Sequence, residues 1–280
     1  MNRLGPARFH LGTQGWNYPA WVGPFYPRAA RPADFLSLYA RIFDTVEIDS
    51  TFYAVPAKAA VEHWAKRAPT GFRFALKFPR AATHDDGLAG EASRTTLEQF
   101  VERVSPLGAR LGPILIQLPP EFGPRRRSRL EAFLDGLPPG LRFAVEFRDP
   151  AWLESSIFES LAARRIAPAL TDSPFLPLDA MLDLASRMGD GAMAGVDFAY
   201  VRWLGSRDLA DYSRVQVDRT AELTRWARVL PGLLGRGIDV YGYFNNHYAG
   251  HSPASARAFL ELVGMTPRDP GDLEPQGDLF

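Results

Sequence analysis

Short runs of alternating hydrophobic and polar residues recur along the chain, and each is followed by a longer stretch with helical spacing. The stretch VEIDSTFY, Val46–Tyr53, is typical. A strand there puts Val46 and Ile48 on one face and Glu47 and Asp49 on the other. Eight such runs predict strands. They are Phe9–Thr13, Thr45–Asp49, Phe72–Phe78, Pro113–Leu118, Arg142–Arg148, Ala167–Asp172, Ala199–Leu204 and Asp239–Phe244.

Apolar residues spaced i, i+3, i+4 and i+7 predict a helix after each strand. The helical stripes begin at Phe35, Val61, Leu97, Leu130, Phe158, Leu178, Leu223 and Ala256, and those at Phe158 and Leu178 are weaker. Eight strands alternating with eight helices favour parallel βαβ units, and 280 residues is near the usual size of a closed barrel. We therefore predict an α/β fold, a single (β/α)8 TIM-like barrel over residues 1–265. An open doubly wound sheet is the alternative, but it usually has fewer strands, and no G-x-G-x-x-G follows the first strand.

The tail, residues 266–280, has a different composition. It is rich in Pro, Gly and acidic residues and shows no periodicity, which predicts a flexible, disordered segment. Its last five residues, QGDLF, resemble the short Q-x-x-L-F peptide by which bacterial DNA enzymes hold the sliding clamp. Gln276, Leu279 and Phe280 would then bind this partner.

Composition narrows the function classes. Lys plus Arg equals Asp plus Glu, at 32 each, so no general basic surface indicates nucleic acid or membrane, although a local patch for nucleic acid stays open. The absence of cysteine excludes disulfides, thiolate metal sites and cysteine nucleophiles. No apolar run is long enough to span a bilayer, and the first residues lack the apolar core of a signal peptide. We expect a cytoplasmic protein with no membrane partner.

The alternation predicts a charged barrel interior, because alternate residues of each barrel strand point inward. The residues predicted to face the axis near the C-terminal mouth are Gln14, Glu47, Asp49, Lys77, Gln117, Glu146, Arg148, Asp172, Arg202 and Asn245. Unpaired buried ions cost several kcal/mol, so opposite charges must pair there. Two interpretations stay open. The charges form a structural ion network that plugs the barrel, or their upper members form an active site, since barrel active sites lie at the C-terminal strand ends.

Several residues are candidates for chemistry at this mouth. Glu47, Asp49, Glu146 and Asp172 are candidate catalytic carboxylates, and His84 and His247 are candidate acids or bases because imidazole titrates near neutrality. These groups also suit a divalent metal. We do not favour one, because no H-x-x-x-H or H-E-x-x-H spacing exists and the basic residues compete for the carboxylates.

An anion site is better supported. Ser252 as N-cap and Pro253 as N1 predict a helix start after the eighth strand, where barrels often bind phosphate. The alternative is an ordinary capped helix. The further candidate ligand contacts are Lys77, Arg80, Gln117, Arg148, Arg202, Asn245 and Asn246. Trp16 and Tyr18 belong to an aromatic loop that either stacks on bases or sugars or covers one barrel end.

Eight motifs in order carry a family resemblance. They are GTQGWNYPAW (12–21), FYP (25–27), EIDSTFY (47–53), KFPRAATH (77–84), QLPPEF (117–122), EFRDPAW (146–152), YVRWLG (200–205) and YFNNHYAGHSPASA (243–256). Together they resemble the YecE-like family, also called domain of unknown function 72, from Phe9 to about Met265. The resemblance implies a TIM-like barrel and supplies no established reaction. It also leads us to expect a histidine at position 204, where this chain has leucine.

The leading hypothesis is an enzyme that acts on a phosphate-bearing substrate, such as a nucleotide or a nucleic-acid end, by phosphoester hydrolysis. Glu47 or Glu146 would act as base or metal ligand and His84 or His247 as acid, while Lys77, Arg148 and Arg202 would bind the anion. One alternative is a non-catalytic adaptor with a structural charged core and a clamp-binding tail. Another is a sugar-acting barrel enzyme, because paired carboxylates and aromatic residues suit glycosidic chemistry.

Overall fold

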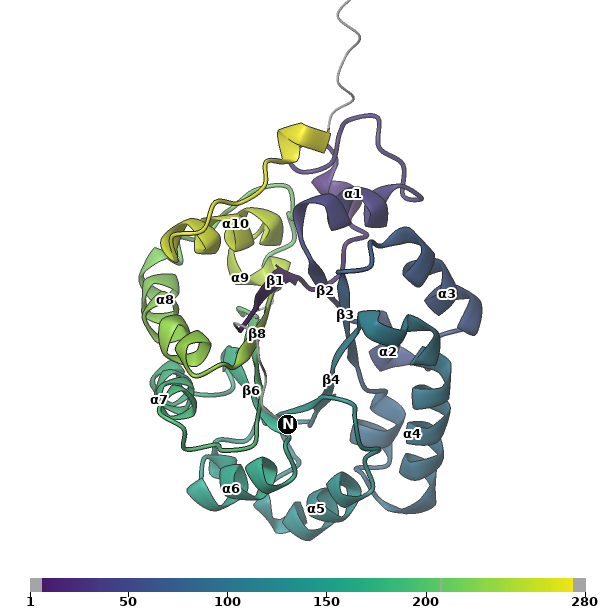
Figure 1. The fold of residues 1–280 in the computed structure, drawn as a ribbon, viewed down its shortest axis with the longest axis vertical. Coiled ribbons are helices and arrows are strands. Elements are labelled where there is room, and N and C mark those ends of the chain that lie inside the picture. The colour runs from purple at the N-terminus through teal and green to yellow at the C-terminus, as the bar shows by residue number, and fades with distance from the viewer. Residues whose placement is uncertain (1–6, 207, 274–280) are drawn as a thin grey trace, which may run out of the picture.

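The computed structural model describes residues 7–206 and 208–273. Eight parallel strands curl into a barrel with the helices outside it (Figure 1). The strands are β1 (Phe9–Thr13), β2 (Thr45–Ile48), β3 (Arg73–Lys77), β4 (Leu111–Gln117), β5 (Phe143–Glu146), β6 (Ala167–Asp172), β7 (Phe198–Trp203) and β8 (Asp239–Phe244). Their order, β1-β8-β7-β6-β5-β4-β3-β2, follows the chain around the barrel. The predicted (β/α)8 barrel is confirmed. The first residue of each strand lies within two residues of the predicted first residue.

The barrel closes between β1 and β2 through a short contact. Gln14 and Glu47 form a single parallel bridge, and the Gly15 N–H donates to the Glu47 carbonyl at 2.8 Å. Gly12 makes this approach achievable, because a Cβ at this position would lie 2.0 Å from the Thr45 carbonyl oxygen. β1 and β2, the two ends of the hydrogen-bonded strand order, are therefore joined by few hydrogen bonds.

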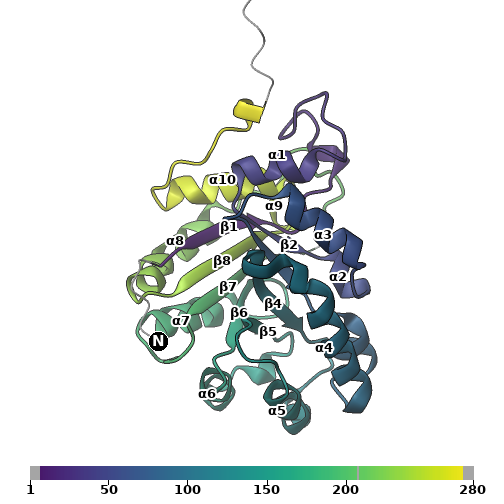
Figure 2. The same cartoon turned by 45° about the vertical axis from the view of Figure 1, so that its right-hand side comes forward.

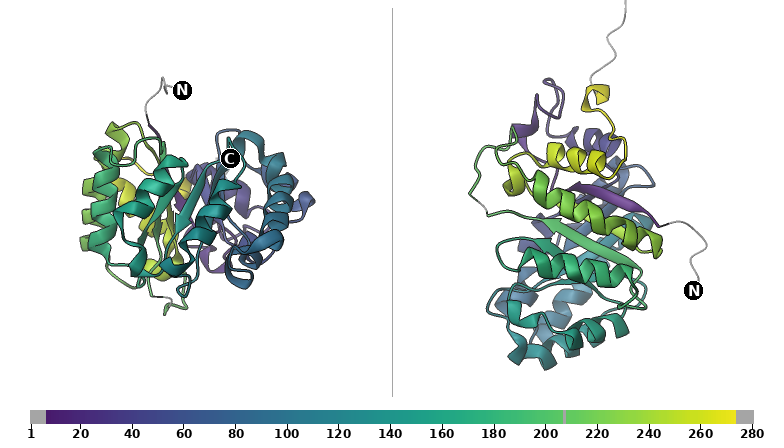
Figure 3. Two further views of the ribbon diagram at one scale, coloured as in Figure 1. Left: turned by 90° about the horizontal axis from the view of Figure 1, so that it is seen from below. Right: turned by 90° about the vertical axis from the view of Figure 1, so that its left-hand side faces the viewer.

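The helices cover the outside of the strands (Figures 2 and 3). They are α1 (Phe35–Ile42), α2 (Ser50–Tyr53), α3 (Lys58–Arg67), α4 (Gly90–Val104), α5 (Arg127–Asp135), α6 (Ser155–Ala163), α7 (Leu178–Gly189), α8 (Thr220–Gly235), α9 (Asn246–Ala249) and α10 (Ser252–Leu262). All eight predicted helices are present, including the two with weaker stripes. The four-residue helices α2 and α9 were not predicted, because one turn is too short to show periodicity. Among the described helices, none has both the length and the apolar character that crossing a membrane requires.

The apolar core lies between the outer face of the barrel and the helices. Trp203 of β7 stacks on Phe244 of β8 with ring centroids 4.2 Å apart, and Phe259 of α10 packs on Trp203 at 5.0 Å. All three are at most 3% exposed, and burying such a side chain is worth roughly 1.5–3 kcal/mol. The outward strand positions thus hold the helices, which leaves the inward positions free for polar side chains.

Small inward residues make room for long ones across the barrel. Ala75 pairs in register with Glu47, and Ala169 pairs with Tyr200. The space beside such short side chains is filled by Tyr200, Tyr243 and Arg202, which are almost completely buried. Long polar side chains therefore reach the barrel axis, where they can meet partners from other strands.

The expectation of disorder from Thr266 onward is wrong for residues 266–273. A 3-10 turn over Pro270–Leu273 buries Leu273, which is 3% exposed. Arg41 of α1 donates to the Asp272 carbonyl, and Arg268 donates back to the Arg41 carbonyl at 3.0 Å. Burial of one leucine and these hydrogen bonds hold a segment whose composition alone indicated disorder. The clamp-binding residues Gln276, Leu279 and Phe280 lie outside the described residues, so that partner stays a prediction.

Candidate functional site at the barrel mouth

A buried ion cluster fills the barrel below its C-terminal mouth. Arg202 of β7 donates Nε and Nη2 to the two carboxylate oxygens of Glu47, at 2.9 and 2.8 Å, and Nη1 to Glu146. The Tyr200 hydroxyl donates to Glu47 Oε2 at 2.6 Å. None of these four side chains is more than 2% exposed. One guanidinium therefore joins two carboxylates from opposite sides of the barrel, in the bidentate geometry that arginine favours.

Arg148 extends this cluster toward solvent. It follows β5 and donates Nε to Glu146 Oε1 at 2.9 Å and Nη2 to Gln117 Oε1 at 2.9 Å. Its guanidinium carbon lies 4.5 Å from the ring centroid of Phe175, a cation–π contact. Glu146 is thus held between two arginines, and Arg148 extends the cluster to the mouth.

The two buried glutamates differ electrostatically. Burial raises the pKa of Glu146, but Arg202, Arg148 and Lys77 outweigh that effect and bring the pKa to about 2. Burial also raises the pKa of Glu47, against the opposing effect of Arg202, and the nearby Asp49 charge adds to the rise. Glu146 is therefore a permanent anion at neutral pH and cannot act as a proton donor there.

This arrangement predicts a specific acid dependence of stability. The folded-state pKa of Glu146 is depressed from 4.5 to about 2, so its contribution is complete above pH 4.5 and is lost as the pH falls toward 2. We expect the difference in unfolding free energy between wild type and Glu146→Gln to shrink by about 3 kcal/mol from pH 7 to pH 2. Urea unfolding at several pH values measures it, and a constant difference would contradict the assignment.

A cavity of about 270 Å³ opens above the ion cluster. It is lined by Gln14, Asp49, Tyr53, Lys77, Arg148, Pro174, Phe175, Arg202, Leu204, Gly205, Ser206 and Asn245. The lining thus contains three basic side chains and one carboxylate. Glu47 and Glu146 below balance the charges of Arg202 and Arg148, and Asp49 faces Lys77. The lining therefore offers both cationic donors and a carboxylate to a ligand.

Asp49 and Lys77 face each other in this cavity. The distance from Lys77 Nζ to Asp49 Oδ1 is 3.8 Å, and the ammonium lies 4.1 Å from the ring centroid of Phe52. Lys77 is 7% exposed, and burial lowers its pKa. An ammonium group with a lowered pKa gives up its proton more readily than an exposed one.

Two polar atoms beside the cavity have no hydrogen-bond partner among the described residues. They are Asp49 Oδ1 and Gln14 Nε2, and both are buried from solvent. Gln14 Oε1, in contrast, accepts from Asn245 Nδ2 at 2.5 Å, which fixes the orientation of this amide. Buried polar groups are normally paired, so one unmet acceptor and one unmet donor at the same cavity indicate a site that a ligand or ordered water completes.

Comparisons with known proteins agree with this fold. The family model described as "Protein of unknown function DUF72" matches residues 10–278. The chain belongs to the DUF72 family. YecE of Escherichia coli K12 is 33% identical over 169 residues, a match that spans 59% of each chain. YunF of Bacillus subtilis is 23% identical over 92% of this chain and 98% of its own.

Two solved DUF72 structures show the same fold. The protein from Thermotoga maritima MSB8 has a TM-score of 0.75 at 24% identity and covers 92% of this chain and 99% of its own. The protein from Enterococcus faecalis V583 has a TM-score of 0.69 at 18% identity and covers 93% of this chain and 99% of its own. At these identities the likeness concerns the fold alone.

In this DUF72 barrel most of the residues predicted to face the axis do so. Glu47, Glu146 and Arg202 form the buried cluster, and Asp49, Lys77, Arg148 and Asn245 line the cavity, while Gln117 contacts Arg148. Leu204, where we expected histidine, also lines the cavity, so this departure falls at the mouth. Among the residues that sequence reasoning missed, Tyr200 lies on the same face of its strand as Arg202, and that alternation was a usable signal.

Asp172 does not face the barrel axis, and that expectation is wrong. Its Oδ2 accepts from Trp226 Nε1 of α8 at 3.1 Å and from the Tyr248 hydroxyl at 2.9 Å. The register explains this, because Thr171 pairs with the inward Arg202 and Asp172 pairs with the outward Trp203. In this DUF72 protein Asp172 holds a helix to the barrel.

The predicted anion site at the start of α10 is also wrong. Ser252 is fully buried, and its N–H and hydroxyl donate to Asn246 Oδ1 at 3.0 and 2.8 Å. The same oxygen accepts from Trp21 Nε1 at 3.3 Å, and the N-cap position is His251 rather than Ser252. The helix start is therefore closed by protein groups, as the ordinary-cap alternative requires.

The two histidines and Arg80 lie outside the cavity lining. His84 Nδ1 lies 2.8 Å from the Thr83 hydroxyl, and its ring packs edge-on against Phe52. Burial lowers the pKa of His84, with the nearby charges of Arg148, Lys77 and Arg80 adding to the effect. His247 Nε2 lies 3.0 Å from the Tyr212 hydroxyl, and Arg80 pairs with Asp85 at 3.0 Å. The lowered pKa favours the neutral form of His84, which can accept a proton.

The aromatic loop mainly covers one end of this DUF72 barrel. Trp16 packs edge-on against Trp64, with ring centroids 6.2 Å apart, and Tyr18 packs on the buried Trp21 at 4.7 Å. Burial raises the pKa of Tyr18, and the Asp49 charge raises it further. The Tyr18 hydroxyl donates to the carbonyl of Gln14, a cavity residue, at 3.0 Å, so this phenol lies near the mouth. The described residues contain no group of three or more His, Cys, Asp or Glu side chains that could hold a metal ion.

Proposed function

We propose that the barrel mouth binds a small phosphate-bearing molecule and hydrolyses its phosphoester bond. One observation carries this proposal. Asp49 is the only carboxylate among the described residues that line the cavity, and it lies beside Lys77 and Arg148. Its buried Oδ1 has no hydrogen-bond partner among those residues. Basic side chains in the lining can donate hydrogen bonds to the oxygens of an anion, and the carboxylate next to them can take a proton from water.

Each polar residue of the cavity has a separate role in the proposed reaction. Arg148 and Lys77 hold the phosphoryl oxygens, and Gln14 Nε2 donates a further hydrogen bond. Asp49 accepts a proton from a water molecule while the water oxygen forms the new bond to phosphorus. The bond from phosphorus to the ester oxygen breaks, and the leaving oxygen takes a proton from the Lys77 ammonium, whose pKa burial has lowered. Bulk solvent then restores both protonation states.

The sugar-acting alternative fits the cluster less well. A glycosidase needs two carboxylates that flank an open cleft, one of them able to donate a proton. Glu47 and Glu146 are instead bound to the same guanidinium of Arg202, and the pKa of Glu146 is about 2. The buried part of the cluster supports the structural interpretation, while the cavity above it supports binding.

The test compares two arginines, one inside the cavity lining and one outside it. Isothermal titration with inorganic phosphate and with p-nitrophenyl phosphate is run on wild type, Arg148→Gln and Arg80→Gln, and release of p-nitrophenol is followed. We expect Arg148→Gln to weaken binding roughly tenfold or more, because a charge-assisted hydrogen bond is lost. Arg80→Gln should bind as wild type does, because Arg80 pairs with Asp85 away from the cavity.

Melting temperatures of both variants accompany the titrations, because Arg148 also supports Glu146. If neither probe binds wild type, or if Arg148→Gln binds like wild type while folded, the proposal fails. Binding without release of p-nitrophenol would support the non-catalytic alternative instead.

A further inference from the structure

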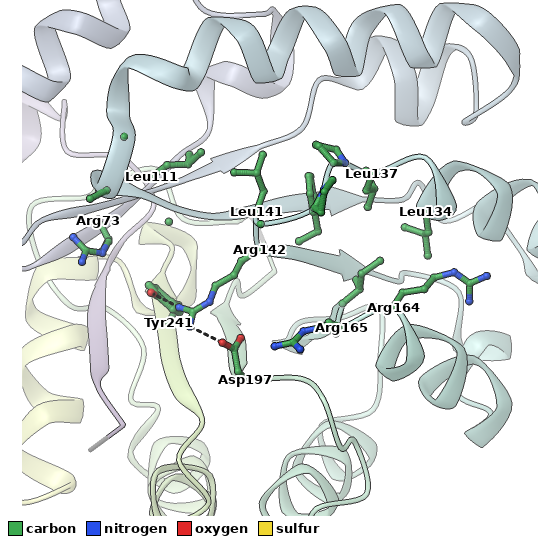
Figure 4. Close-up of a pocket in the computed structure, with 18 of the residues that line it drawn as sticks. Arg73, Leu111, Leu134, Leu137, Leu141, Arg142, Arg164, Arg165, Asp197 and Tyr241 are labelled. Carbon is green, nitrogen blue, oxygen red and sulfur yellow. Dashed lines mark hydrogen bonds and ion pairs between the residues drawn. The ribbon is translucent and has the colours of Figure 1, made fainter. Parts of the chain in front are cut away.

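A second and larger cavity lies at the opposite end of the barrel. Its volume is about 740 Å³, and it is formed where β3, β4, β5 and β6 begin, with Tyr241 of β8 facing it (Figure 4). Cavities of this size are typical of small-molecule sites. The walls combine apolar side chains, among them Leu111, Leu137 and Leu141, with four arginines and two aspartates. This lining suits a ligand with an organic body and negative charge.

Two of the four arginines are fully engaged by protein acceptors. Arg142 donates to Asp239 and Asp197 at 3.1 and 3.0 Å and to the Tyr241 hydroxyl at 2.9 Å. Arg164 forms a bidentate pair with Asp135 at 2.7 and 3.2 Å. Their charges are therefore matched inside the protein.

The other two, Arg73 and Arg165, pair with no carboxylate among residues 7–206 and 208–273. Arg73 Nη1 donates to nearby loop carbonyls at 3.1 to 3.5 Å, which leaves its charge uncompensated. The structure gives the Arg165 guanidinium no acceptor in the described part of the chain. In Figure 4 the Arg165 side chain extends toward Asp197 and Arg142, whereas Arg164 turns the other way. The cavity thus holds two cationic groups with unused donors.

The backbone at Arg165 adds an independent observation. Arg165 follows the end of α6 with a φ of +60°, the left-handed conformation that glycine adopts without strain. Its N–H donates to the Ala162 carbonyl at 2.9 Å, and the Ile166 N–H donates to the Leu161 carbonyl at 3.0 Å. This is a Schellman C-cap, where glycine is the usual residue. An arginine at this position costs stability, and its strained backbone points to a role for the side chain.

We propose that the N-terminal end of the barrel carries a second ligand site, which binds a small organic anion through Arg73 and Arg165. Guanidinium groups recognise phosphate and carboxylate in the same bidentate manner, so the ligand carries one or more groups of either kind. Chemistry in barrel enzymes takes place at the other end, so this site binds without catalysing. It does not depend on the function proposed for the mouth.

The test uses pyrophosphate, AMP and citrate as probes in isothermal titration with the full chain. Arg165→Gly is the key variant, because glycine relieves the strained backbone. We expect its melting temperature to equal or exceed that of wild type, while its dissociation constant for the bound probe rises tenfold or more. Arg73→Gln should weaken the same probe. The choice among the three probes separates phosphate from carboxylate ligands.

Two matched controls locate the binding. Arg164→Gln removes a guanidinium that lines the same cavity but is bound to Asp135, so it should change the dissociation constant less than twofold. Arg148→Gln alters only the mouth, where a phosphate probe can also bind, so it should leave unchanged the separate binding event that Arg165→Gly and Arg73→Gln weaken. The proposal is overturned if no probe binds wild type, if Arg165→Gly and Arg73→Gln bind as wild type does, or if the binding event that they weaken is also lost in Arg148→Gln.

Discussion

Replacement of Arg202 by methionine is expected to lower the free energy of unfolding by about 3–5 kcal/mol. The variant keeps a long side chain in the barrel but leaves Glu47 and Glu146 buried without the guanidinium that binds both. Ions buried without a partner lose hydration and gain nothing in return, so removal of one member of such a cluster costs more than the cluster itself contributes. Urea unfolding monitored by tryptophan fluorescence measures the change.

Two comparisons show whether charge burial is the cause. Arg214→Met breaks an exposed ion pair with Asp211 and should cost roughly 0.5 kcal/mol or less. The triple variant Arg202→Met, Glu47→Gln, Glu146→Gln removes the unpaired charges and should regain part of the lost stability. A loss below about 1 kcal/mol for Arg202→Met would mean that the glutamates find other partners or take up protons at little cost.

Replacement of Asp49 by asparagine is expected to lower kcat for phosphomonoester hydrolysis by roughly 10²- to 10⁴-fold, the usual contribution of a general base. Asparagine has nearly the same shape and still lines the cavity, but its amide cannot accept the proton from the attacking water. Because Lys77 and Arg148 remain, KM should change little. Steady-state kinetics with p-nitrophenyl phosphate give both constants.

Asp85→Asn is the matched control for this variant, because Asp85 is an exposed carboxylate that pairs with Arg80 outside the cavity. It should retain the wild-type kcat. An Asp49→Asn protein that turns over substrate at the wild-type rate would remove Asp49 from the mechanism. A large rise in KM at constant kcat would assign it to binding instead.

The charged interior of the barrel has two layers, a buried ion cluster and the residues around the cavity above it. Glu47, Glu146 and Arg202 saturate one another's hydrogen bonds below the mouth, whereas Asp49 and Lys77 stand 3.8 Å apart with an open cavity beside them. The two interpretations of the charged interior therefore apply to different depths of the same barrel. The lower layer is closed by its own ion pairs, and the upper layer borders the cavity.

The sequence by itself determined the fold and the charged residues that line the mouth. Alternation in β2, β5 and β7 depends only on backbone geometry, so it correctly directed Glu47, Glu146 and Arg202 inward without any knowledge of tertiary contacts. The helices could be predicted for the same reason, because apolar residues three and four positions apart lie on one face of a helix. The exception was Asp172. Ala169 and Thr171 take the inward positions of β6, so the same alternation directs Asp172 outward.

Only the tertiary structure decided which charged groups pair with one another below the mouth and which line the cavity. Arg202 meets Glu47 across 155 residues of sequence and Glu146 across 56, so no local pattern distinguishes these paired carboxylates from Asp49. The same holds for Asn246, which closes the start of α10, and for Arg165, whose charge at the other end of the barrel pairs with no carboxylate among the described residues. Periodicity reports the direction of a side chain, whereas pairing depends on what the rest of the chain places opposite it.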